Sequence, residues 1–383
     1  MKRYYENSYV TEFETVIEKI CGNKIYLEDT YFYPASGGQL CDTGTINGLS
    51  VVNVCLDEDH KVIHFLEDNA PFQPGESVKC AIDWERRFDF MQQHSGQHLI
   101  SGILDVYYQI YTKSFHMGMN ESTIDVQSAF PINIDEIEDM VNKAILNAQP
   151  IATVFYNNLD ELGQIHLRKP PKMQQNIRVV SIGDLDATPC GGTHLRNTSE
   201  LQLLKITRVE AYKGGYRISF VFGKRALNLF AFEHRILHRL VQILSVPVEN
   251  IEAEISRLTG DSSLLKKEID EHKRKMAGYL AEILYHEAEP VKKYRLLTKK
   301  NDVSAEMLRL TAQYLIEKQN LLVFIYNNEG HFVLASSINY HINLAELVQQ
   351  MDWKGGGSES LLQGVITDNS QIPAFIICLK EKL

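Results

Sequence analysis

Two histidine motifs far apart in the chain place the strongest constraint on its fold. HSGQH contains His94 and His98, and CGGTH contains Cys190 and His194. If all four side chains bind one metal ion, two segments that lie 92 residues apart (190 − 98) must meet. A thiolate combined with imidazoles is a ligand set that zinc takes in proteins. The alternative is a buried cysteine with solvated histidines, and the spacing leaves both interpretations open.

The expected secondary structure distinguishes the HxxxH patterns of the chain. Residues 86–108 have apolar residues at helical spacing, and histidines four apart on a helix lie about 5–6 Å from each other on one face. His60 and His64 lie in a strand-like run, where four residues span about 13 Å, so they cannot share an ion. His234 and His238 are helical but are each followed by arginine. The pair in HSGQH is therefore the best candidate, and the serine after its first histidine argues against an HExxH metalloprotease.

The pattern of strands and helices predicts an α+β protein. Residues 8–80 hold short runs rich in β-branched and aromatic residues with turn residues between them. This pattern indicates a small β-barrel, or else a simple antiparallel sheet. After the helix, strand-like segments with one further helix at 134–149 predict an α+β domain up to about residue 235.

The C-terminal third changes character. Residues 249–289 have apolar residues at heptad spacing, which predicts either a helix pair bent at residues 260–263 or an extended coiled arm. From about 300 onward we expect helices at 303–319 and 343–351 and a hairpin formed by 321–327 and 331–339. A glycine-rich loop at 355–364 should lead into a helix, and 374–380 should form a last strand.

Composition excludes several classes of protein. The net charge of −10 argues against a protein that coats nucleic acid indiscriminately. Residues 201–310 nevertheless carry 20 Lys and Arg against 14 Asp and Glu, which suits a partner held by one basic stretch. No apolar stretch approaches the ~20 residues that span a bilayer, and no signal sequence is evident. Six cysteines are too few for a disulfide scaffold, so we expect a cytoplasmic protein with no membrane partner.

With these motifs in place, the chain resembles the editing domain of alanyl-tRNA synthetases and the free-standing alanyl-tRNA editing proteins. HSGQH followed by Leu-Ile, and CGGTH, resemble the two metal-binding motifs of that family. YPASGGQLCDTG at 33–44 is similar to the glycine-rich signature of the family's N-terminal barrel. Residues 114–126, 214–227 and 355–364 resemble the strand after the zinc helix, the end of the editing domain and a DHHA1-type loop. The resemblance covers nearly the whole chain and indicates a long-form free-standing editing protein.

The resemblance also implies a domain layout. It comprises an N-terminal β-barrel with the glycine-rich motif (1–88), a zinc-dependent editing domain (89–240), a helical arm or hairpin (241–298) and a DHHA1-type domain (299–383). The last domain would bind tRNA or mediate formation of a homodimer. Because the chain begins at the barrel and has no DHH triplet, we expect neither ATP-dependent activation of alanine nor phosphodiesterase activity.

The implied function is hydrolysis of misacylated tRNA(Ala), chiefly Ser-tRNA(Ala) or Gly-tRNA(Ala), in trans to the synthetase. One alternative is a non-catalytic tRNA- or synthetase-binding protein whose zinc is structural. A further alternative is a metal hydrolase that acts on small esters. Activity on charged tRNA distinguishes the first from the other two.

The resemblance assigns the four motif residues as metal ligands, and residues near them or in basic and glycine-rich stretches are candidates for further roles. One Zn²⁺ per chain would be held by His94, His98, Cys190 and His194. Candidates for orienting water or the serine hydroxyl are Ser95, Gln97, His116 and Thr193. Candidates for contact with the substrate or tRNA are Gly37, Gly38, Gln39, Asp42, Arg217, Lys224, Arg225, Gly355, Gly356 and Gly357. The plainer alternatives are buried polar residues, a tight turn and a solvated basic face.

Four protein ligands raise a difficulty, because catalytic zinc normally keeps one coordination position open. Either one ligand, for which His194 is a candidate, leaves when substrate binds, or the ion only positions the substrate. The sequence leaves both open.

Overall fold

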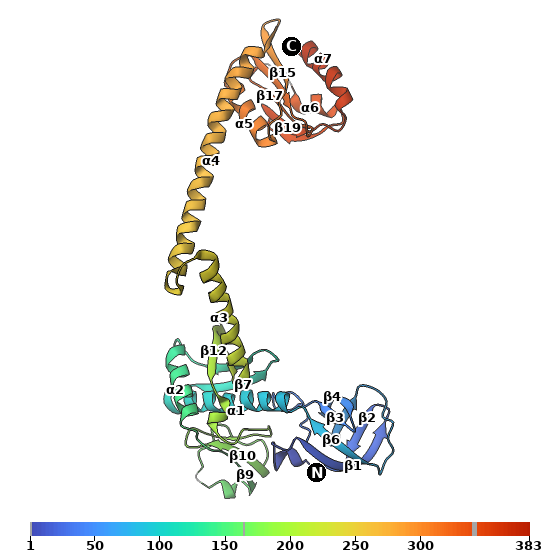
Figure 1. Cartoon of the computed structure of the whole chain (residues 1–383), viewed down its shortest axis with the longest axis vertical. Helices are drawn as coiled ribbons and strands as arrows, with labels where there is room; N and C mark the ends of the chain where they lie inside the picture. The colour runs from blue at the N-terminus through green and yellow to red at the C-terminus, as the bar shows by residue number, and fades with distance from the viewer. Residues whose placement is uncertain (1, 164, 339–342) are drawn as a thin grey trace. The chain divides into compact units, whose positions relative to one another are not determined.

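The computed structural model describes residues 2–163, 165–338 and 343–383. Contacts divide the chain into two units, Met1–Arg239 and Leu240–Leu383, and Figure 1 shows the elements of each. Both units mix helices and strands, as predicted.

The first unit begins with a closed six-stranded barrel in the order β1-β2-β5-β4-β3-β6. Its strands are β1 (Glu12–Cys21), β2 (Lys24–Leu27), β3 (Gly44–Ile46), β4 (Leu49–Leu56), β5 (Val62–Leu66) and β6 (Ser77–Ile82). Apolar side chains such as Ile17, Ile25, Val54 and Val78 fill its interior, because alternate residues of a strand face inward. The barrel interpretation is thus confirmed over the simple sheet.

Helix α1 (Trp84–Tyr108) is the central element of the first unit. The Asp83 side chain accepts a hydrogen bond from the Arg86 N–H and caps the helix start. All residues from Phe90 to Leu104 are buried. The helix lies along a sheet in the order β12-β13-β8-β7 and contacts β7 and β13 (Figure 1). The strands are β7 (Tyr111–Met117), β8 (Ser122–Gln127), β12 (Leu204–Tyr212) and β13 (Gly215–Phe222).

Helix α2 (Ile134–Leu146) and a further, three-stranded sheet also belong to the first unit. The sheet has the order β11-β10-β9, with β9 (Ile151–Asn158), β10 (Gln175–Ile182) and β11 (Asp186–Pro189). Because β11 ends at Pro189, the CGGTH loop starts directly at the end of this strand. Short 3₁₀ turns cover Arg3–Tyr5, Asp160–Leu162 and Thr198–Leu201.

One long helix, α4 (Ile251–Glu287), occupies most of residues 241–298, where an arm was predicted, and helix α3 (Lys224–Leu244) ends within the first residues of that region. Helix α4 runs without interruption. Of the two alternatives left open by the sequence, the helix pair bent at residues 260–263 is therefore wrong. One glycine costs a helix only about 1 kcal/mol, which the long α4 tolerates. The helical path is broken earlier in the chain, between α3 and α4. There Ser245 has a left-handed φ of 56°, and a 3₁₀ turn covers Val248–Asn250.

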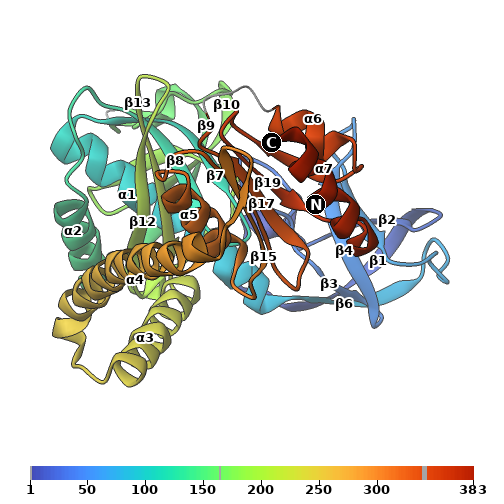
Figure 2. The same ribbon diagram turned by 90° about the horizontal axis from the view of Figure 1, so that it is seen from above.

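The second unit contains a mixed sheet in the order β14-β15-β16-β17-β19-β18. Its strands are β14 (Glu289–Val291), β15 (Tyr294–Lys300), β16 (Leu321–Tyr326), β17 (His331–Ser336), β18 (Lys354–Gly357) and β19 (Leu361–Val365). Helix α5 (Ala305–Leu315) and the end of α4 pack on one face, with α6 (Leu344–Gln349) and α7 (Ile372–Lys382) on the other (Figure 2). The predicted β16–β17 hairpin is confirmed, although Asn339, at its predicted end, lies outside the described residues.

Two predictions for this unit are wrong. Residues 374–380, predicted as a strand, belong to α7, where Phe375 and Leu379 are buried four residues apart. A short apolar run fits a strand and a buried helix equally well. The glycine-rich segment forms the antiparallel pair β18–β19 instead of a loop that leads into a helix. Glycine allows this pairing because a Cβ at Gly364 would lie 2.1 Å from the Lys354 carbonyl oxygen.

Within the described residues, no helix is long and apolar enough to cross a membrane.

Candidate metal centre

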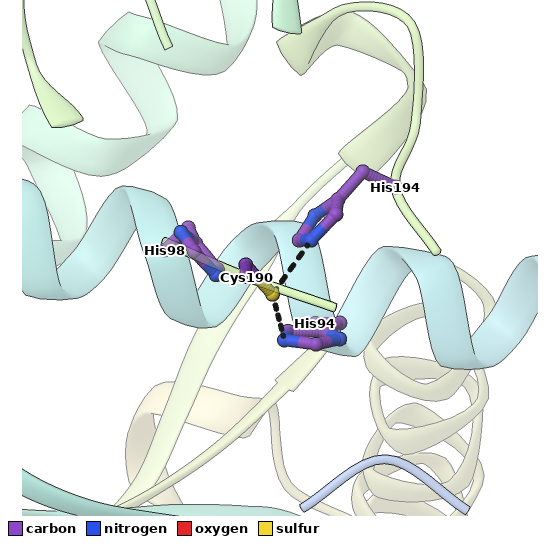
Figure 3. Close-up of side chains that lie close together, drawn as sticks. All are labelled: His94, His98, Cys190 and His194. Carbon is purple, nitrogen blue, oxygen red and sulfur yellow. Dashed lines mark hydrogen bonds between the residues drawn. The ribbon is translucent and has the colours of Figure 1, made fainter. Parts of the chain in front are cut away.

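The structure brings the four predicted ligands together. His94 and His98 project from α1, and Cys190 and His194 come from the loop after β11 (Figure 3). Their potential ligand atoms all lie within 4.8 Å of one another. The Cys190 Sγ atom is 3.4 Å from His94 Nε2 and 3.3 Å from His194 Nε2. Tetrahedral zinc would separate such atoms by roughly 3.3–3.6 Å, so the group can hold a metal ion.

Glycine in the loop permits this approach. A Cβ added at Gly192 would lie 2.1 Å from His94 Cε1 and 2.8 Å from Gln39 Oε1. The Gly192 N–H also donates to the Cys190 sulfur at 3.3 Å. The loop therefore packs directly on the His94 ring, and a larger residue would displace that ring.

Each imidazole of the centre has a hydrogen-bond partner at Nδ1. The pairs are His94 with Gln39 Oε1 (2.7 Å), His98 with Asp186 Oδ2 (2.7 Å) and His194 with Ser95 Oγ (3.1 Å). A partner that accepts from Nδ1–H places the lone pair on Nε2, the atom that faces the centre in each ring. This arrangement is typical of histidines that bind a metal.

The electrostatics of the buried cluster favour a thiolate. Burial raises the pKa of the Cys190 thiol, but the three imidazoles outweigh burial and hold that pKa well below its usual value. Burial lowers the pKa of His194 to about 3. Burial also acts to lower the pKa of His98, but the charges of Cys190 and Asp186 outweigh it and raise this pKa to about 9. The thiolate is the form of cysteine that binds metals.

The predicted catalytic residues divide into two groups. Ser95 bonds to His194 and accepts the Leu195 N–H at 3.1 Å, and the Thr193 hydroxyl accepts from Gln39 Nε2 at 2.7 Å. The structure therefore brings Ser95 and Thr193 to the centre. Gln97 instead donates along α1 to Ser101 at 2.8 Å.

His116 is exposed on β7 and does not reach the centre. Its neighbour Phe115 faces inward instead and stacks on the His94 ring with a centroid separation of 5.5 Å. The alternation of side chains along a strand explains why these neighbours point in opposite directions.

The glycine-rich motif forms a tight turn against the metal centre. Gly37 and Gly38 have left-handed φ values of 58° and 87°, and an isolated bridge pairs Ser36 with Gln39. Of the predicted contacts in this motif, Gln39 reaches the centre. Asp42 is fully buried in an ion pair with Arg87 of α1.

The predicted tRNA contacts are engaged in other interactions. Carboxylates pair with all three basic residues, namely Arg217 with Asp125 (2.6 Å), Lys224 with Glu85 (2.8 Å) and Arg225 with Asp89 (2.7 Å). Gly355, Gly356 and Gly357 lie exposed on the edge strand β18.

Sequence reasoning missed Asp186 and Arg87. An acidic residue on the segment that leads into a ligand loop was a usable signal for Asp186, because ligand histidines commonly bond to carboxylates. No local sequence pattern identifies Arg87 as the partner of Asp42.

Two family descriptions match parts of the chain. Residues 177–219, which include CGGTH, match the threonyl and alanyl tRNA synthetase second additional domain. Residues 5–86, which include the barrel, match the class II (A) tRNA synthetases.

Several relatives match most of the chain. It is 32% identical over 364 residues to the alanyl-tRNA editing protein Aarsd1 of Mus musculus, covering 92% of this chain and 87% of the relative. It is 29% identical over 379 residues to the alanyl-tRNA editing protein AlaX-L of Pyrococcus horikoshii, covering 94% and 93%. An alanine–tRNA ligase of Methanococcus aeolicus is 28% identical over 376 residues, which are 96% of this chain and 41% of the ligase.

Among solved structures, the C-Ala domain from Aquifex aeolicus alanyl-tRNA synthetase is 27% identical, with a TM-score of 0.22. It covers 24% of this chain and 95% of the domain. Overall, the chain spans most of the length of the two editing proteins and about two fifths of the ligase.

Proposed function

Because the chain belongs to the family of alanyl-tRNA editing proteins, we propose that it hydrolyses misacylated tRNA(Ala) in trans at a zinc site. The substrates would be chiefly Ser-tRNA(Ala) and Gly-tRNA(Ala). The observation that carries this proposal is the group of three imidazoles and one cysteine whose ligand atoms lie within 4.8 Å of one another. Within it, Nε2 of His94 and Nε2 of His194 lie 3.4 Å and 3.3 Å from the Cys190 sulfur.

The substrate is an ester between the amino acid and the terminal ribose. A zinc ion held by His94, His98, Cys190 and His194 would polarise the ester carbonyl or lower the pKa of a bound water toward ~7. The residues of the chain hold these ligands in place and exclude bulk water from the buried centre.

Of the four ligands, His194 is the best candidate to leave when substrate binds. Its Nδ1 bonds to a hydroxyl at 3.1 Å, whereas the other two imidazoles bond to a carboxylate and an amide oxygen at 2.7 Å. Its departure would open the position that catalytic zinc requires.

Thr193 is the best-placed residue for recognising the serine hydroxyl. Gln39 holds its oxygen, and the residue lies between the two loop ligands. A site that hydrogen-bonds a hydroxyl rejects alanine, because alanine would leave its polar group without a partner. Ser95 is less suited, since its oxygen already serves His194 and the Leu195 N–H.

We propose that the remaining predicted roles follow the same layout. Residues 299–383 would bind tRNA or form a homodimer, with Gly355–Gly357 on an exposed edge. The basic residues Arg217, Lys224 and Arg225 would have to exchange their carboxylate partners for phosphates.

The test uses purified protein with Ser-tRNA(Ala), Gly-tRNA(Ala) and Ala-tRNA(Ala). We expect release of serine or glycine well above release of alanine, loss of this release on chelation, and its return with Zn²⁺. His98→Ala should abolish the activity, and His116→Ala, which removes an exposed histidine off the centre, should not. Binding of tRNA and zinc without any release of amino acid would instead support a second candidate function, a tRNA-binding protein with a structural zinc. The four protein ligands favour this candidate, because structural zinc sites have no open coordination position.

A further inference from the structure

A carboxylate outside the ligand set contacts the metal centre. Asp186 is the first residue of β11, four positions before Cys190, and its side chain is 0% exposed. Its Oδ2 atom accepts from His98 Nδ1 at 2.7 Å. This bond fixes both the rotation of the His98 ring and the nitrogen that carries the proton.

The carboxylate is itself held on its other side. Arg168 donates from Nε to Asp186 Oδ1 at 2.6 Å, and its side chain is only 4% exposed. Thr188 Oγ1 donates to the same oxygen at 2.9 Å. A buried carboxylate with these partners stays ionised and has little freedom to rotate.

We propose that Asp186 is a positioning residue of the metal centre, held in turn by Arg168. It fixes the orientation of the His98 ring, so that Nε2 is directed toward the other three ligand atoms before an ion arrives. Arg168 balances the charge of Asp186. The carboxylate can therefore orient His98 without placing a net negative charge close to the ion. The inference concerns metal binding, and it rests on the proposed function only for its effect on catalysis.

The test measures zinc affinity by competition with a chromophoric chelator and records the absorption spectrum of the Co²⁺-loaded protein. Asp186→Ala should weaken zinc binding by about 10- to 100-fold and alter the ligand-field bands of Co²⁺. Asp186→Asn should have a smaller effect, since an amide oxygen still accepts from His98. Asp184→Asn, which removes an exposed carboxylate two residues away, is the matched control and should change neither quantity.

Wild-type zinc affinity and an unchanged Co²⁺ spectrum in Asp186→Ala would overturn the proposal. If this variant fails to fold, Asp186→Asn and Arg168→Gln provide the same readouts, and wild-type values in both would overturn it equally. Weaker metal binding in a protein whose wild type does not deacylate tRNA would refute the proposed function and leave the positioning role intact.

Both polar atoms of the Gln39 side-chain amide form hydrogen bonds at the metal centre. Its Oε1 accepts from His94 Nδ1 at 2.7 Å and from the Thr193 N–H at 3.1 Å. Its Nε2 donates to the Thr193 hydroxyl at 2.7 Å. We infer that Gln39 positions His94 and Thr193, so that the glycine-rich turn of the barrel supports the metal centre without itself contacting the amino acid of the substrate.

This role predicts a signature that a substrate contact would not produce. Gln39→Met keeps the volume and removes the hydrogen bonds, so it should weaken zinc binding by about 10-fold. Gln39→Glu should restore most of this loss because a carboxylate also accepts from His94. Thr30→Val, which breaks a buried bond to His64 elsewhere in the barrel, is the control and should leave zinc affinity unchanged.

Unchanged zinc affinity in both Gln39 variants, with an altered ratio of serine to glycine release, would overturn the inference in favour of substrate recognition. If Gln39→Met does not fold, Gln39→Ala takes its place. Because zinc affinity is measured without tRNA, absence of deacylation in the wild type would not affect this result.

Discussion

The ion pair between Asp42 and Arg87 allows a sharp test of what joins the barrel to α1. Both side chains are 0% exposed. Arg87 donates from Nε to Asp42 Oδ1 at 2.8 Å, and its other nitrogens donate to the carbonyls of Ser8 (2.7 Å) and Tyr31 (2.6 Å). Asp42 also accepts the Tyr33 N–H. The guanidinium therefore depends on one carboxylate for charge balance in a site that water does not reach.

Replacing Asp42 with alanine leaves a buried, uncompensated cation. Breaking such a pair from one side costs about 3–5 kcal/mol. For a unit of this size each kcal/mol lowers the melting temperature by about 2–4 °C, so the shift should be of the order of 10 °C. The double variant Asp42→Leu with Arg87→Met removes both charges and should recover much of the loss.

The assay is denaturant unfolding and thermal melting of the wild type, Asp42→Ala and the double variant, with Asp42→Asn as an intermediate. A loss of stability below about 1 kcal/mol in Asp42→Ala would refute the reasoning. A variant of wild-type stability with impaired binding of aminoacyl-tRNA would show instead that Asp42 contacts the substrate, as the glycine-rich motif suggested.

Three further outcomes are expected. Burial lowers the pKa of His64 to about 4, below its unfolded value of about 6.5, so the unfolded state binds more protons between these pH values. The free energy of unfolding should fall by up to about 3 kcal/mol as pH drops from 6.5 to 4. The prediction is contradicted if wild type and His64→Gln differ in stability by the same amount at every pH in this range. Gly192→Ala should lower the metal content of purified protein, because the added Cβ would lie 2.1 Å from His94 Cε1. Gly96→Ala should cost about 1–3 kcal/mol in denaturant unfolding, since its Cβ would lie 2.2 Å from the Phe222 ring, and Phe222→Leu should recover part of the loss.

The group of four candidate ligands could be predicted from the sequence because its signals are local. A helical repeat places His94 and His98 on one face, and the chemistry of a cysteine and a histidine around two glycines marks the partner loop. Short runs of β-branched residues with turn residues between them likewise predicted the barrel.

The sequence did not show which partner each proposed ligand contacts, because these pairings depend on how distant segments pack. Gln39 lies 55 residues before His94, and Asp186 lies 88 residues after His98. The position of Asp186 close to the CGGTH loop was a usable local signal, but nothing within a window of a few residues identifies His98 as its partner. The same limit explains α7, whose apolar run becomes a helix only through its packing against the sheet of the second unit.

The separation of the two ligand-bearing segments imposes an order on biogenesis. During translation His98 leaves the ribosome 92 residues (190 − 98) before Cys190, an interval of roughly 5 to 20 seconds at ordinary elongation rates. Throughout that interval the nascent chain contains His94 and His98 but not yet Cys190 or His194. Capture of an ion by all four proposed ligands would therefore follow closure of the CGGTH loop, which would make metal loading a late event in maturation.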